Sequence, residues 1–72
     1  MNYRDAIRNI GARHAKPGED WDQNLLTGAP AVVDAAEALR IADWLDTRAD
    51  AEWGDDQRYH DMATDIRALL NG

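Results

Sequence analysis

The side chains that could perform chemistry in this chain are carboxylates, histidines and threonines, and none of them completes a metal-binding motif. Asp20, Asp22 and Asn24 copy the start of a calcium-binding EF-hand loop. Leu25 stands where that loop needs a glycine, and Ala31 stands where it needs a bidentate glutamate. We therefore interpret these acids as the first turn of a short helix and predict no metal site.

Catalytic residues are not indicated either. Asp56 and His60 are four residues apart, as two ligands on one helix face would be, but a metal needs a third ligand, so an exposed ion pair is expected. His14 continues the apolar face of the first helix, where a histidine usually packs. Serine and cysteine do not occur in the sequence. We predict no catalytic residue, no cofactor and no enzymatic activity.

A row of aspartates is the most suggestive feature. Asp43, Asp46 and Asp50 recur at i, i+3 and i+7, so they share one helix face, and Asp55 and Asp56 extend the row. Neighbouring carboxylates would lie about 5–6 Å apart, close to the spacing of phosphates along a nucleic-acid strand. The row predicts a cationic partner; the alternative is an ordinary solvated face.

Tryptophans near this row allow two interpretations. Trp44 or Trp53 could be an aromatic anchor inside an acidic rim, as is common at interface hot spots. Alternatively, Trp21 and Trp44 close a minor core over residues 17–30, since large aromatic side chains are mostly buried.

Helices must position these residues, because apolar side chains recur at helical spacing and no segment alternates with period two. We expect a first helix capped by Asn2 and ended by residues 16–18, a short helix within 19–26 with Gly28 in the left-handed conformation, and a long helix from Pro30 to Ala49. A last helix, capped by Asp55 or Asp56, should run to the end of the chain. The apolar faces of the last two helices comprise Ala35, Ala38, Ile41, Ala42, Leu45 and Ala49, and Tyr59, Met62, Ala63, Ile66, Leu69 and Leu70.

Length and charge restrict the remaining possibilities. The chain has 72 residues, a net charge of −6 and no cysteine. This length and the helical spacing predict one all-α domain spanning residues 1–72, a small bundle of three main helices plus a possible short helix, with no sheet. The acidic charge argues against direct nucleic-acid binding, and the lack of a long apolar run argues against a membrane segment, so we expect a cytoplasmic protein. Such a small core favours function at the outer surface.

Two segments resemble known proteins. Residues 42–46 (Ala-Asp-Trp-Leu-Asp) and 65–70 (Asp-Ile-Arg-Ala-Leu-Leu) are similar to the C-terminal helices of small acidic phage proteins, among them anti-CRISPR proteins that imitate DNA. This resemblance implies a non-enzymatic inhibitor that binds a basic, nucleic-acid-binding groove of a host protein, with Asp43, Asp46 and Asp50 carrying the charge mimicry. The alternative is a structural or regulatory protein that self-associates, as a homodimer, through its alanine-rich helix face.

Overall fold

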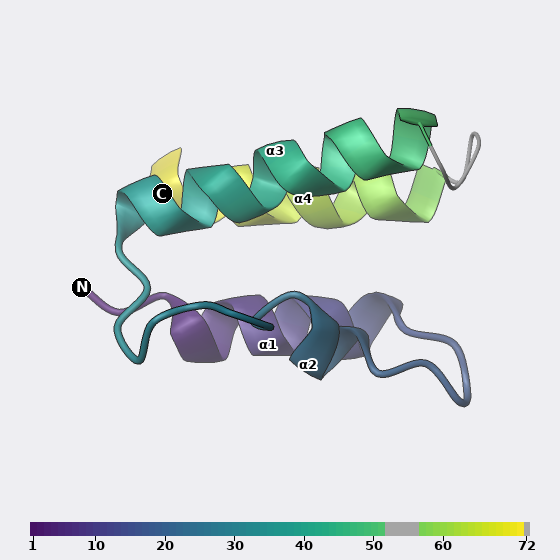
Figure 1. The fold of residues 1–72 in the computed structure, drawn as a ribbon, viewed down its shortest axis with the longest axis horizontal. Helices are drawn as coiled ribbons and strands as arrows, with labels where there is room; N and C mark the ends of the chain where they lie inside the picture. The colour runs from purple at the N-terminus through teal and green to yellow at the C-terminus, as the bar shows by residue number, and fades with distance from the viewer. Residues whose placement is uncertain (52–56, 72) are drawn as a thin grey trace.

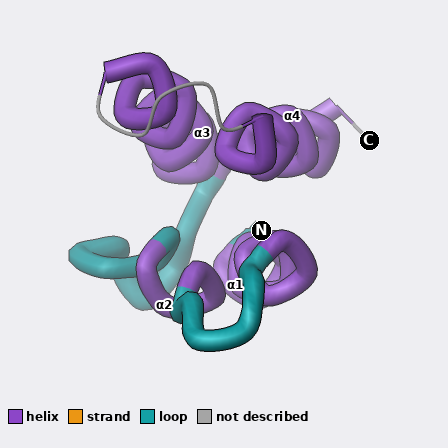
Figure 2. The backbone as a smooth tube through the Cα atoms, turned by 90° about the vertical axis from the view of Figure 1, so that its right-hand side faces the viewer, coloured by secondary structure: helices purple, strands orange, loops and turns teal. Residues whose placement is uncertain are grey.

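The computed structural model describes residues 1–51 and 57–71, and it shows an all-α bundle in which these residues form no strand. The helices are α1 (Arg4–His14), α2 (Trp21–Asn24), α3 (Ala35–Ala51) and α4 (Gln57–Asn71). Helices α3 and α4 run antiparallel to each other in one layer, and α1 and α2 form the other (Figures 1 and 2). The predicted fold class is therefore confirmed.

The core lies between the two layers and is built largely from the predicted apolar faces. Ala38, Ala42 and Ala49 of α3 are completely buried, and their small side chains allow α3 to pack closely in the bundle. Ala35 is the exception on this face, because it is exposed at the first position of α3. The buried core residues are Ile7, Ile10, Trp21, Leu25, Leu26, Val33, Ala38, Ile41, Ala42, Leu45, Ala49, Tyr59, Met62, Ala63 and Ile66.

The long helix begins later than the sequence predicted. It starts at Ala35 rather than at Pro30, and Asp34 caps it by accepting a hydrogen bond of 2.9 Å from the backbone N–H of Glu37. Residues 30–33 are not helical because their backbone bonds to the start of the chain. The N–H of Tyr3 donates to the carbonyl of Val33 at 2.8 Å, and the N–H of Val33 donates to the side-chain oxygen of Asn2 at 3.0 Å.

The start of α1 also differs by one residue: its N-cap is Tyr3 and not Asn2, although the Asn2 side chain accepts the backbone N–H of Arg4 at 3.0 Å. The end of α1 is as expected, at His14, just before residues 16–18. Helix α2 spans only four residues within the predicted 19–26, and Gly28 has the expected positive φ of 78°. The predicted caps of the last helix, Asp55 and Asp56, lie outside the described residues. Among the described helices, none has the length and apolarity needed to cross a membrane.

Candidate functional site

The predicted aspartate row lies along one edge of α3, where that helix faces α4. We call Asp43, Asp46 and Asp50, together with His60 and Arg67 of α4, the acidic edge. The side chains of Asp43 and Asp50 are 73% and 71% exposed, whereas that of Asp46 is 31% exposed. The sequence thus correctly placed the three carboxylates on one face of a helix.

Arg67 of α4 binds two of these carboxylates at once. Its Nη2 donates to Oδ1 of Asp43 at 2.8 Å, and its Nη1 lies 2.7 Å from Oδ2 of Asp46. Paired with both carboxylates, the guanidinium has a pKa raised above its usual value. Partial burial disfavours the charged form of Asp46, but hydrogen bonds from His60 and Arg67 outweigh it and hold the pKa of that carboxyl below its usual range.

His60 occupies the second half of this edge. Its Nδ1 lies 2.8 Å from Oδ1 of Asp46, and its Nε2 lies 3.1 Å from Oδ1 of Asp50. Each of the three carboxylates therefore has a partner on α4. The three aspartates are therefore not an uncompensated anionic row, because Arg67 and, when it is protonated, His60 offset two of their three negative charges.

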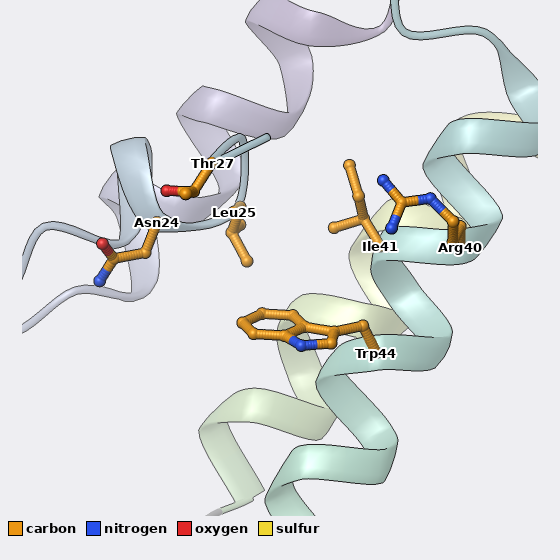
Figure 3. Close-up of a pocket in the computed structure, with 6 residues that line it drawn as sticks. All are labelled: Asn24, Leu25, Thr27, Arg40, Ile41 and Trp44. Carbon is orange, nitrogen blue, oxygen red and sulfur yellow. The ribbon is translucent and has the colours of Figure 1, made fainter. Parts of the chain in front are cut away.

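Trp44 lies on the other flank of α3. It lines a pocket of about 190 Å³ between α3 and the end of α2 (Figure 3), with Asn24, Leu25, Thr27, Arg40 and Ile41 as the other lining residues. At 100° per residue, Trp44 and Asp46 point roughly 160° apart. Trp44 therefore points away from Asp46, and its role as an aromatic anchor stays a prediction.

The alternative interpretation, in which Trp21 and Trp44 are both buried, holds for Trp21 alone. Trp21 is buried, and its ring centroid lies 4.9 Å from that of Tyr59. Trp44 does not fit that interpretation: it is 37% exposed and lies outside the buried core, and it lines the same pocket as Leu25 (Figure 3). Three further predicted site residues, Trp53, Asp55 and Asp56, lie outside the described residues.

Sequence reasoning missed the two basic partners of the acidic edge. Arg67 lies 24 residues from Asp43, and His60 lies 14 residues from Asp46. Both residues lie beside the apolar face of the last helix. When two antiparallel helices pack through their apolar faces, residues that flank those faces come close together, so this position could have indicated the pairing. The predicted ion pair between Asp56 and His60 lies outside the described residues, because Asp56 does.

The chemistry available to these residues is the binding of charge. Both ring nitrogens of His60 face carboxylates, so in this arrangement neither is presented to a substrate. The other histidine, His14, is also engaged: its Nε2 lies 2.8 Å from Oδ2 of Asp65, which Arg13 approaches at 3.4 Å. In residues 1–51 and 57–71, no group of three or more His, Asp or Glu side chains could hold a metal ion.

Comparison of the chain with protein-family models, with curated proteins and with solved structures gave no match.

Proposed function

We propose that this chain is a non-enzymatic, phage-type inhibitor whose acidic edge binds a basic surface of a host nucleic-acid-binding protein. The observation that carries the proposal is the exposure of Asp43 and Asp50 on one edge of a packed helix pair. Even with Arg67 and a protonated His60 counted, this edge keeps one net negative charge, and the whole chain carries −6. Long-range attraction would therefore favour a cationic partner.

The internal ion pairs change how such binding would work. Arg67 already satisfies one oxygen of Asp43 and one of Asp46, so a partner would bind the remaining lone pairs or displace the guanidinium. The same bonds hold the carboxylates in fixed positions, which lowers the entropy lost on binding. This favours recognition of a fixed pattern of charges over imitation of a fully ionised phosphate strand.

The test uses variants that spare the half-buried Asp46. An Asp43→Asn, Asp50→Asn double variant removes two exposed charges from the acidic edge. An Asp5→Asn, Asp20→Asn variant removes two exposed charges from the layer of α1 and α2 and is the matched control. Both should keep the helical circular-dichroism spectrum of the parent chain.

Binding would be measured against purified nucleic-acid-binding proteins recovered on the immobilised parent chain from a host lysate. We expect one such protein to be retained, to be released by high salt and by duplex DNA, and to be lost with the acidic-edge variant but not with the control. Equal binding by both variants would contradict the proposal, as would retention that DNA does not affect.

The alternative hypothesis, self-association as a homodimer, relies on an alanine-rich helix face that is largely buried within one chain. Three of the alanines in the helix face are completely buried inside the single chain, against its own core. The large apolar residues that stay exposed in the described part of the chain are Met1, Val32, Leu39 and Trp44, and none of them belongs to the alanine-rich face.

A further inference from the structure

His60 joins the two longest helices through both of its ring nitrogens. It lies in the first turns of α4, and its two partners, Asp46 and Asp50, are one turn apart on α3. The imidazole is mostly buried, with 28% of its surface exposed. One side chain of α4 thus holds the second half of α3 at two points.

The two contacts of the His60 ring favour one protonation state over the other. A neutral imidazole carries one N–H, so it can donate to one carboxylate and must turn a lone pair toward the other. Two lone pairs facing each other at 3.1 Å would repel. The imidazolium form has two N–H groups and can donate to Asp46 and Asp50 together, so the two contacts fit the cation better than the neutral ring.

We propose that His60 is a proton-operated latch between α3 and α4. With a proton bound, the ring donates to both carboxylates and ties the two helices together. When the proton is lost, one of the two bonds must break, and the freed carboxylate turns to solvent. Asp50 is the one expected to separate, because it is the more exposed partner and its contact is the longer one.

The surrounding charges favour the latched form. On α3, Asp46 and Asp50 face the ring, and Asp43 lies farther along the same edge. On α4, Arg67 forms an ion pair with the same Asp46, and the Asp61 carboxylate accepts a hydrogen bond from Gln57. The described charged groups of α1 nearest to α4, Arg13 and His14, bind Asp65 instead. The hydrogen bond to Asp46 and the nearby charge of Asp50 outweigh partial burial and raise the pKa of His60 above its ordinary value of 6.5.

The direction of the effect follows from linkage. Because the pKa is raised in the folded state, the contribution of His60 to stability is complete below about pH 6.5 and is lost as the pH rises through the folded-state pKa. Loss of the proton also leaves the acidic edge with two net negative charges instead of one. The latch does not depend on the proposed function, although a cationic partner would bind the open form more strongly.

Nuclear magnetic resonance titration of the histidine Cε1–H signals tests the proposal directly. A His14→Gln variant assigns the remaining signal to His60. We expect this signal to titrate at a higher pH in the folded chain than in urea, and Asp50→Asn to lower its midpoint while Asp5→Asn leaves it unchanged. A folded-state midpoint equal to or below that in urea would overturn the latch.

Urea unfolding over a range of pH gives a second, independent measurement. The stability of the parent chain and of His14→Gln should share a decrease above about pH 6.5 that is absent from His60→Gln. An equal decrease in His60→Gln would contradict the proposal. Should His60→Gln fail to fold, the titration of the parent chain and of Asp50→Asn still decides the question.

Discussion

Gly11 of α1 lies directly against the backbone carbonyl of Trp21 in α2. A Cβ atom added at Gly11 would lie 2.5 Å from that carbonyl oxygen and 2.7 Å from its carbon. Both atoms belong to the backbone, so neither can move aside as a flexible side chain would. The absence of a side chain at Gly11 is therefore what allows the two helices of this layer to approach each other.

Replacing Gly11 by alanine should destabilise the fold although alanine is the better helix former. The overlap with Trp21 forces α1 and α2 apart, and overpacking of this kind costs about 1–3 kcal/mol of unfolding free energy. Urea unfolding followed by circular dichroism measures the change. Asn9→Ala, at an exposed position of the same helix, is the control and should be neutral or slightly stabilising. A gain in stability from Gly11→Ala would show that the helices can separate without loss.

The two described tryptophans should differ strongly in their contribution to stability. Trp21 is 7% exposed and packs on Tyr59, so Trp21→Ala should cost about 3–5 kcal/mol, which is comparable with the whole stability of so small a domain. Trp44 borders an open pocket, and Trp44→Ala should cost at most about 2 kcal/mol. Thermal unfolding of both variants measures the difference. Equal losses would mean that Trp44 belongs to the core.

An ion pair between Arg58 and Glu19 joins the two layers and should make the stability of the fold sensitive to acid. Both Nη atoms of Arg58 in α4 donate to the Glu19 carboxylate, and Nη1 also donates to the carbonyl of His14 at 3.3 Å. The hydrogen bond from Arg58 is the main cause that lowers the pKa of Glu19, and the backbone N–H of Lys16 adds to it. The stabilisation is therefore present above about pH 4.5 and is lost as the pH falls through the lower, folded-state pKa.

We expect Glu19→Gln to be less stable than the parent chain at neutral pH and the difference to shrink in acid. Urea unfolding at several pH values measures this difference. Glu37→Gln is the control, because Glu37 pairs with Arg40 three residues along an exposed face of α3, where such pairs contribute little. A gap between Glu19→Gln and the parent that stays constant down to low pH would rule out the carboxylate pairing as its cause.

The parts of the fold that the sequence predicted are those that depend on local periodicity. The buried face of α4, from Tyr59 to Ile66, follows from apolar residues three and four positions apart, and Gly28 follows from its place after a short helix. The start of α3 was misplaced because Pro30 suits a first helical turn. Its backbone neighbours are instead bonded to Asn2, 29 to 31 residues away, and no local pattern contains that information.

The candidate site divides in the same way. The common face of Asp43, Asp46 and Asp50 is a property of one helix, and spacing alone predicts it. The groups that offset the charge of those aspartates lie on α4, so they depend on how α4 packs beside α3. Charge counted along a single helix therefore overestimated the anionic character of the surface, because two of the balancing groups lie on the neighbouring helix.

The bonds of Asn2 have a consequence for how the chain can be shortened. Its side chain accepts from Arg4 and Val33 and donates to the carbonyl of Ala31 at 3.2 Å, so residues that would ordinarily fray are part of the junction between the two layers. Removing the first three residues would leave the sequence of α1 complete. It would also remove the hydrogen bonds that hold residues 31–33, the segment that leads into α3. We therefore expect a chain shortened to begin at Tyr3 or Arg4 to lose these contacts, and one that begins at Asn2 to keep them.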